Sequence, residues 1–168
     1  PHQSINWLWP GRIARGKVSI IAGNPGLGKS QLTASLAAIV TTGGIWPVDN
    51  ISCQPGSVIL LSAEDDPADT IGPRLKAAGA DLTKAQFLKC VHTKNKQGKL
   101  LEKSFSLKTD IANLDKFLEE VQNVSLLIID PITAYLGETD SYKNAEVRAL
   151  LSPLSELAAK HNLAVLAI

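Results

Sequence analysis

The sequence predicts an α/β fold with a largely parallel, buried sheet, and three observations lead to this prediction. Apolar runs that resemble strands alternate with segments of helical periodicity along the chain. A glycine-rich turn links the first apolar run to a helical segment, and a later apolar run ends in an aspartate. Such continuous apolar strands are typical of parallel sheets, because helices cover both faces of the sheet.

Five apolar runs are the predicted strands. Each run is short, contains many branched side chains and is bounded by turn-forming or helical segments. The runs cover residues 18–22, 58–63, 87–92, 126–130 and 163–168, and the third of them is the weakest.

Four helices are predicted, which cover residues 29–41, 67–78, 110–122 and 144–161. The first stops at Gly43, a typical helix-ending residue. Asp66 is the expected N-cap of the second helix, with Pro67 at its first position. Pro73 should bend or interrupt that helix, and Pro153 should kink the last one.

Two connecting segments are long. Residues 43–57 contain several glycines and prolines, whereas residues 93–108 are polar and rich in lysine. The alternation of side chains around residues 99–107 is compatible with a small hairpin. The simplest interpretation of the lysine-rich segment is a solvated excursion from the fold.

The strongest functional pattern lies in the turn between the first predicted strand and the first helix. Residues 23–30 match the pattern G-x-x-x-x-G-K-[ST] at every fixed position. The glycines let backbone N–H groups wrap around a phosphate, and the following helix directs its positive end at the same group. Lys29 is expected to reach the β- and γ-phosphates of ATP, and the Ser30 hydroxyl is expected to ligate Mg²⁺. ATP and Mg²⁺ are therefore the predicted cofactors.

Nine residues are the predicted contacts to the nucleotide, namely Gly23, Asn24, Pro25, Gly26, Leu27, Gly28, Lys29, Ser30 and Gln31. Magnesium also needs a carboxylate at the end of a nearby strand. Asp130 follows four apolar residues, at the point where the predicted strand leaves the sheet. We therefore predict Ser30 and Asp130 as the metal ligands.

Hydrolysis of ATP additionally needs a base that orients and deprotonates water. Glu64 follows the second predicted strand, and strand ends at this edge of a parallel sheet face the ligand crevice. We predict Glu64 and Lys29 as the catalytic residues. Asp65 and Asp66 are rivals, although Asp66 is explained more simply as a helix cap, and a solvated acidic turn is the alternative for all three.

Composition limits the other possibilities. A chain of 168 residues with 45% hydrophobic content suffices for one compact domain. Because 17 basic residues nearly balance 16 acidic ones, any contact with nucleic acid must come from local loops. The apolar runs are too short to span a membrane, and Cys53 and Cys90 fit free thiols in a reducing cytoplasm.

The two ends of the sequence are unusual. The chain begins with Pro1, contains no methionine and ends in an apolar run at Ile168. Chain termini normally lie at the surface of a domain. We therefore expect residues 1–168 to be a single ATPase core cut from a longer chain and truncated at its C-terminal side.

The combined pattern resembles the RecA-like P-loop ATPases. The resemblance is carried by the turn 23–30, the Ser-Ala-Glu-Asp strand end at 62–65, and the strand 126–130 followed by Pro131. It is closest to the RepA/DnaB-type hexameric replicative helicases and to the AAA-type ATPase domains fused to phage or plasmid primases. Segments 7–13 and 71–75 are similar to that group as well.

This resemblance has several implications. Glu64 would be the catalytic glutamate and Asp130 the magnesium aspartate, with one strand between the strand that precedes the glycine-rich turn and the strand of Asp130. The protein would form a homo-oligomeric ring, a hexamer, with ATP at the subunit interfaces and single-stranded DNA in the channel. The sensor residue and the arginine finger of the family would lie beyond Ile168, so we expect an isolated fragment to hydrolyse ATP weakly.

Three functions are compatible with these patterns. The first is a DNA-dependent ATPase, a helicase domain that acts in the replication of DNA or of a mobile element. The second is a RecA-like ATPase that remodels or regulates a protein partner, as KaiC-type proteins do. The third is a small-molecule P-loop kinase, which is disfavoured because the sequence has no arginine-rich lid and because Glu64 ends a strand.

The loop 132–143, directly after Asp130, has two interpretations, a DNA contact and an ordinary surface loop. Tyr135, Tyr142 and Lys143 are suited to stack on a base or to meet a phosphate. An ordinary surface loop is the favoured interpretation, because the same loop carries two acidic residues. Arg74 lies on a predicted helix and is expected to be a surface ion-pair partner.

Overall fold

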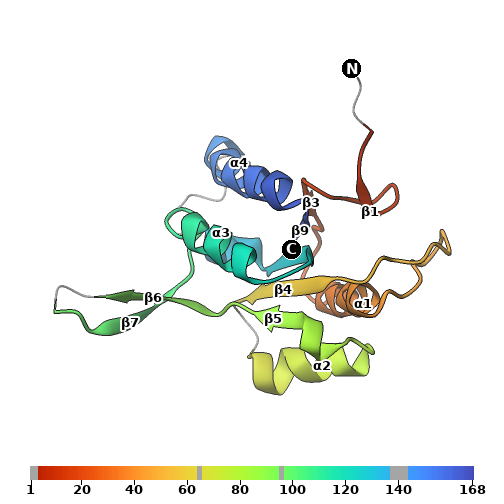
Figure 1. The fold of residues 1–168 in the computed structure, drawn as a ribbon, viewed down its shortest axis with the longest axis horizontal. Coiled ribbons are helices and arrows are strands. Elements are labelled where there is room, and N and C mark those ends of the chain that lie inside the picture. Colours follow the sequence, from red (N-terminus) through yellow and green to blue (C-terminus); the bar gives the residue numbers. More distant parts are fainter. Residues whose placement is uncertain (1–3, 64–65, 95–96, 137–143) are drawn as a thin grey trace.

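A computed structural model describes residues 4–63, 66–94, 97–136 and 144–168 of the chain. Its central sheet has five parallel strands in the order β3-β9-β8-β4-β5. Their bounds are Val18–Ile20 (β3), Ala164–Ala167 (β9), Val124–Asp130 (β8), Ser57–Ser62 (β4) and Ala85–Phe87 (β5). The predicted α/β fold is confirmed (Figure 1), and β9 lies between β3 and β8, as the resemblance implied.

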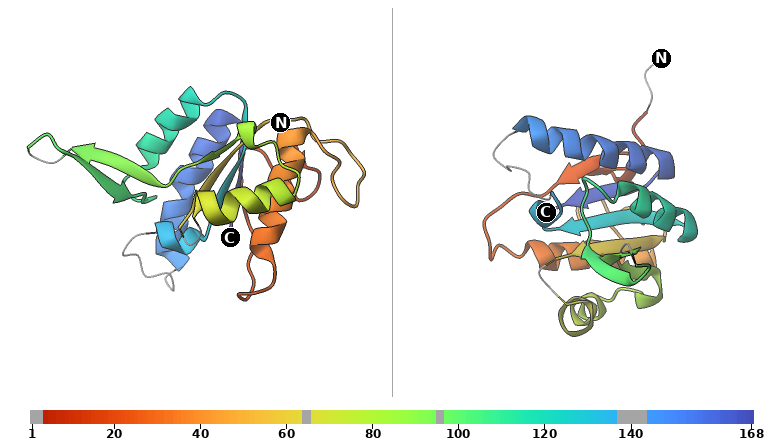
Figure 2. Two further views of the ribbon diagram at one scale, coloured as in Figure 1. Left: turned by 90° about the horizontal axis from the view of Figure 1, so that it is seen from below. Right: turned by 90° about the vertical axis from the view of Figure 1, so that its left-hand side faces the viewer.

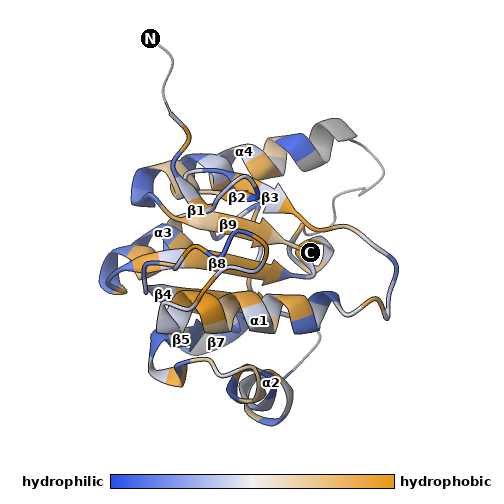
Figure 3. Ribbon diagram, turned by 90° about the vertical axis from the view of Figure 1, so that its right-hand side faces the viewer, coloured by the Kyte–Doolittle hydropathy of each residue, from blue (hydrophilic) through white to orange (hydrophobic). Residues whose placement is uncertain are grey.

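Helices cover both faces of this sheet (Figures 1 and 2). Their bounds are Lys29–Thr42 (α1), Gly72–Ala77 (α2), Ile111–Glu120 (α3) and Asn144–His161 (α4). Alternate side chains of each strand enter two separate cores: Leu60 and Ile128 pack on the side of α1 and α2, whereas Leu61 and Ile129 pack on the side of α3 and α4. The sheet is therefore buried on both faces, and Figure 3 shows its central strands as hydrophobic.

The predicted helix signals are confirmed in the structure. α1 ends at Gly43, which has a positive φ of 71° and donates its N–H to Ile39 O. Asp66 caps the next helical segment by accepting the N–H of Ala68 at 2.8 Å. That segment starts as a π-helical turn, η1 (Pro67–Ile71), and α2 begins only at Gly72. This irregular start fits the predicted interruption, because Pro73 has no N–H to donate to a regular helix.

The predicted strand 87–92 is wrong, because two different strands share these residues. β5 ends at Phe87 after three pairs with β4, and β6 (Cys90–Lys94) then pairs with β7 (Leu100–Ser104) in an antiparallel hairpin. The hairpin expected around 99–107 exists, although its first strand lies upstream of that range, and much of the long loop 93–108 is ordered in it. β5 is an edge strand, so the chain can leave the sheet there without breaking a central ladder.

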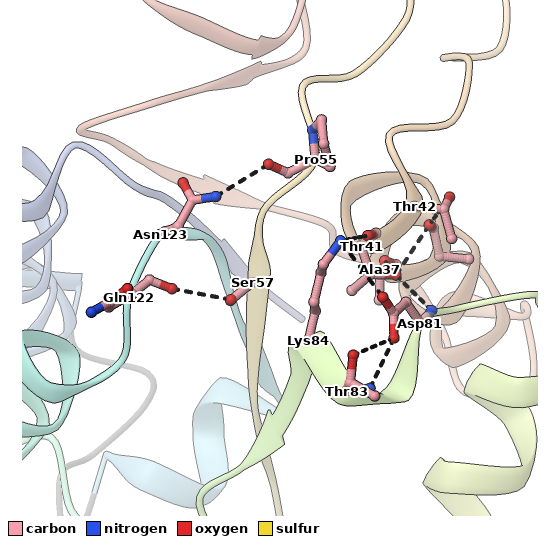
Figure 4. A network of polar contacts seen from close by, with 11 residues as sticks. Ala37, Thr41, Thr42, Pro55, Ser57, Asp81, Thr83, Lys84, Gln122 and Asn123 are labelled. Atoms are coloured by element: carbon pink, nitrogen blue, oxygen red, sulfur yellow. Dashed lines mark hydrogen bonds and ion pairs between the residues drawn. The ribbon is translucent and has the colours of Figure 1, made fainter.

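Side-chain hydrogen bonds hold the connections at the edge of the sheet opposite the strand ends (Figure 4). Asp81, which caps the short helix η2 (Leu82–Lys84), donates its N–H to Thr41 Oγ1 at 3.1 Å. Lys84 Nζ donates to Thr41 O at 3.2 Å, and Asn123 Nδ2 donates to Pro55 O at 3.3 Å. These contacts fix the C-terminal end of α1 and so help to orient its N-terminal end.

An N-terminal hairpin packs against the same region. Its strands are β1 (Trp7–Trp9) and β2 (Ile13–Ala14). Trp9 stacks on Trp46 with ring centroids 5.1 Å apart, and the Arg12 guanidinium lies 5.0 Å from the centre of the Trp9 ring. Cys53 is a buried free thiol, as predicted. Within the described ranges, no helix is long and apolar enough to cross a membrane.

Gly56 makes a close approach that no other residue type fits. A Cβ at this position would overlap the hydroxyl of Ser125 and lie 2.8 Å from Ser125 Cβ. We expect Gly56→Ala to lower the free energy of unfolding by about 1–3 kcal/mol, because the buried Ser125 has no room to move. Urea unfolding followed by tryptophan fluorescence measures this change.

Gly44→Ala is the matched control for Gly56→Ala. The nearest atom to an added Cβ at Gly44 is Ile39 Cα at 3.4 Å, an ordinary contact. The control should change the free energy of unfolding by no more than about 0.5 kcal/mol. Equal effects of the two substitutions would show that the contact with Ser125 does not constrain the fold.

Candidate nucleotide-binding site

The glycine-rich turn lies between β3 and α1, at the edge of the sheet where the parallel strands end. Gly26 and Gly28 have positive φ angles of 81° and 79°, a region that other residue types rarely adopt. A Cβ at either glycine would meet open space. The backbone conformation, and not crowding by neighbouring atoms, therefore requires glycine at these two positions.

The N-terminus of α1 is open toward this turn. Gly28 is the N-cap residue, no side chain caps the helix, and its first turn has no acidic residue. The first N–H groups of a helix have no partner within the helix, and the helix dipole adds partial positive charge there. This end of α1 is therefore suited to bind an anion such as a phosphate.

Lys29 adds a full positive charge to the same end. Its Nζ donates to Gly23 O at 2.7 Å and to Asn24 O at 2.9 Å, so the side chain folds back over the turn. These two acceptors are neutral carbonyls. A phosphate oxygen would make a stronger, charge-assisted hydrogen bond with the ammonium group.

Ser30 and Asp130 meet across the sequence. Ser30 lies in the first turn of α1 and Asp130 is the last residue of β8, and Ser30 Oγ donates to Asp130 Oδ2 at 3.3 Å. Magnesium in nucleotide sites is usually held by one or two protein oxygens together with waters and phosphates. A hydroxyl beside a carboxylate fits this role. In the described parts of the chain no group of three or more His, Cys, Asp or Glu side chains offers an alternative metal site.

A cavity of about 580 Å³ opens in front of these groups. Lys29, Ser30 and Asp130 line it together with Gln31, so the structure brings these four predicted residues together. Arg74 of α2 also lines the cavity, although the sequence suggested only a surface ion pair for it. No sequence pattern marks this position, because Arg74 reaches the cavity only through the packing of α2 against α1.

Glu64, the predicted base, lies outside the described residues, as does Asp65. The strand before it is nevertheless placed: Ser62 of β4 pairs in register with Asp130 of β8. Ala63 then donates its N–H to Asp130 O at 3.3 Å. Asp66 is a helix cap and pairs with Lys89 at 2.9 Å. The hydrogen bond from Lys89 is the main reason why the pKa of Asp66 lies below its usual value.

Tyr135 is not available to stack on a base, as a DNA contact of the loop 132–143 would require. It lies in the short helix η3 (Ile132–Tyr135), is only 4% exposed and makes an edge-on contact with Phe105. Burial, assisted by the nearby Asp130 carboxylate, raises the pKa of Tyr135 to about 12, so the phenol stays protonated at neutral pH. Tyr142 and Lys143, the other candidates in this loop, lie outside the described residues.

The strand order and the turn at the N-terminus of α1 define a RecA-like P-loop NTPase fold. Comparison with protein families gives the same class: the family model described as AAA domain matches residues 1–168. The chain therefore belongs to the AAA domain family of P-loop ATPases. A search of curated proteins finds no match to this sequence.

Proposed function

We propose that this chain is the ATP-hydrolysing core of a DNA-dependent ATPase, a helicase domain that acts in the replication of DNA or of a mobile element. The observation that supports ATP hydrolysis best is the meeting of Lys29, Ser30 and Asp130 at one cavity beside the open end of α1. Residues 1–168 would act as a single core, and the protein would work in the cytoplasm as a homo-oligomeric ring.

Each site residue has a distinct proposed role. The Lys29 ammonium and the backbone N–H groups of residues 23–31 other than Pro25 hold the phosphates of ATP. Ser30 and Asp130 hold Mg²⁺, which neutralises charge on the phosphates when it is bound. Glu64 orients and deprotonates the attacking water. This division of roles is supported by the register of β4 and β8, since Glu64 comes two residues after the partner of Asp130.

ATP hydrolysis by the protein, with and without single-stranded DNA, tests the proposed function. We expect DNA to raise the rate of ATP hydrolysis, since a helicase domain couples hydrolysis to its contact with DNA. Robust hydrolysis that is indifferent to DNA would instead favour an ATPase that remodels a protein partner. Transfer of phosphate to a small molecule, without hydrolysis, would favour a kinase.

The proposed magnesium ligands lead to a separate prediction. Asp130→Asn removes the negative charge beside Ser30 Oγ, so the protein should need about 10- to 100-fold more Mg²⁺ for half-maximal hydrolysis. The measurement is the hydrolysis rate as a function of Mg²⁺ concentration, with a chelator as the zero point. Glu156→Gln, which removes an exposed carboxylate on α4, is the control and should behave like the wild type. An unchanged Mg²⁺ requirement in Asp130→Asn would contradict the assignment.

A further inference from the structure

Positive charge is concentrated in one segment of the chain. Residues 89–108, which we call the basic arm, contain six of the 17 basic residues and one of the 16 acidic residues. The remainder of the chain therefore holds 11 basic and 15 acidic residues. Although the net charge of the whole chain is near zero, the basic arm is strongly positive and the rest of the chain is negative.

The basic arm projects from the body of the molecule. Its described residues include β6 and β7, which extend well beyond the sheet and helices in two perpendicular views (Figures 1 and 2), whereas Phe105 and Leu107 at its end are buried in the core. Lys103 lies on β7 and Lys99 directly precedes that strand, four residues away, so the alternation of the strand continued one residue back puts both on one face of the hairpin, and both are exposed. Glu102, the arm's acidic residue, alternates with Lys103 along β7, and both residues line a cavity at the base of the arm. Six lysines therefore share the arm with one carboxylate.

A cavity of about 560 Å³ lies at the base of the arm. Lys89 and Lys103 line it together with the carboxylates of Asp66 and Glu102, and Ser62 and Ala63 line it at the end of β4. Lys89 pairs with Asp66 at 2.9 Å and Lys103 with Asp110 at 3.7 Å. In the Lys89–Asp66 pair both side chains are exposed, at 66% and 44%, and such pairs contribute little, so a phosphate can replace Asp66 as the partner of Lys89. Lys103 is 48% exposed, whereas its partner Asp110 is buried. Asp110 would stay satisfied, because it also accepts the N–H of Ser106 at 2.9 Å.

We propose that the basic arm binds the phosphate backbone of single-stranded DNA, through Lys99 and Lys103 on one face and through the cavity at its base. This inference rests on the proposed function and adds the DNA site to it. A polyanion suits the arm because the arm carries six lysines and one carboxylate. DNA in the cavity would touch Ser62 and Ala63, directly before the proposed base Glu64, so binding at the arm would reach the site of hydrolysis.

The test compares a double substitution in the arm with a matched control. Lys99→Ala/Lys103→Ala removes two charges from the arm, whereas Lys17→Ala/Lys116→Ala removes two exposed lysines from other parts of the chain. Binding of a fluorescein-labelled thymidine oligonucleotide is measured by anisotropy at several salt concentrations. The slope of log K against log salt should be smaller by about 1.4 in the arm variant, since each phosphate contact contributes about 0.7 for single strands. The control should keep the wild-type slope.

Two further measurements accompany the titration. The arm variant should bind DNA at least roughly tenfold more weakly at low salt and lose stimulation of hydrolysis by DNA, while its affinity for ATP stays at the wild-type value. Lys99→Glu is a second variant that avoids the contacts of Lys103 with Thr109 and Asp110, and it should weaken DNA binding in the same way.

Three results would overturn the inference, and they differ in what they say about the function. A wild-type slope in the arm variant, together with hydrolysis that DNA still stimulates, would show that the arm is not the DNA site. The proposed DNA-dependent ATPase function would be unaffected by that result. If the wild-type protein does not bind the oligonucleotide and its rate of ATP hydrolysis does not respond to it, the proposed function is contradicted as well. Unchanged DNA binding with altered sedimentation would show that the arm contacts the acidic body of a second copy.

Discussion

Replacing Lys29 with alanine is expected to weaken ATP binding about a hundredfold, the largest effect of any single substitution on affinity. The ammonium group lies over the turn, within 2.9 Å of two of its carbonyl oxygens, and close to where phosphates would lie against the N-terminus of α1. A charge-assisted hydrogen bond of this kind is worth about 1.5–3 kcal/mol, and the upper value corresponds to roughly a hundredfold in affinity. Equilibrium titration with a fluorescent ATP analogue measures the change.

The control for Lys29→Ala shows whether the loss of any one lysine charge weakens ATP binding, or only the loss of the charge at the turn. Lys17→Ala removes an exposed lysine from the start of β3, away from the turn, and should bind the analogue like the wild type. Because Lys29 also hydrogen-bonds the turn itself, thermal unfolding of both variants shows whether the fold is intact. Wild-type affinity in a folded Lys29→Ala protein would mean that the phosphates bind elsewhere.

Replacing Glu64 with glutamine is expected to lower the rate of ATP hydrolysis by about 10²–10⁴-fold and to leave ATP binding unchanged. Glutamine keeps the shape of the side chain but cannot accept the proton of the attacking water. The measurement is phosphate release at saturating ATP, combined with the binding titration. This pairing distinguishes a lost base from a lost binding site.

Asp69→Asn is the matched control for Glu64→Gln. Asp69 is an exposed carboxylate five residues further along the same segment, and its replacement should leave hydrolysis unchanged. Asp65→Asn tests the rival directly, because Asp65 is the neighbouring carboxylate. Loss of hydrolysis in Asp65→Asn, with a normal rate in Glu64→Gln, would assign the base to Asp65 instead.

The parts of the site that sequence alone predicted are those with local patterns. The turn 23–30 is encoded by glycines and by the helix that follows, so both its conformation and its place before α1 could be read directly. Asp130 could be predicted at a strand end, but its contact with Ser30 depends on the strand order, which joins residues 100 positions apart. The resemblance to RecA-like ATPases supplied that order.

The errors have a common physical cause in pairing and packing between distant residues. The run 87–92 looked like one strand, yet its first residue belongs to the sheet and its last three pair with β7. Tyr135 looked like a surface aromatic, yet its contact with Phe105 buries it. The partner of Phe87 in the sheet, Leu60, and the partner of Tyr135, Phe105, are both far away in sequence, so no local pattern reveals these two contacts.

Amide NMR of the protein during titration with Mg²⁺ and ADP tests the central claim, that nucleotide phosphates bind at the N-terminus of α1, most directly. The largest chemical-shift changes should occur at Asp130 and at residues 23–31 other than Pro25, which has no N–H, because these N–H groups line or adjoin the cavity. Asn123 and Asn162, at the opposite edge of the sheet, should keep their shifts. Unchanged signals at residues 23–31, or larger changes at the opposite edge, would contradict the nucleotide site.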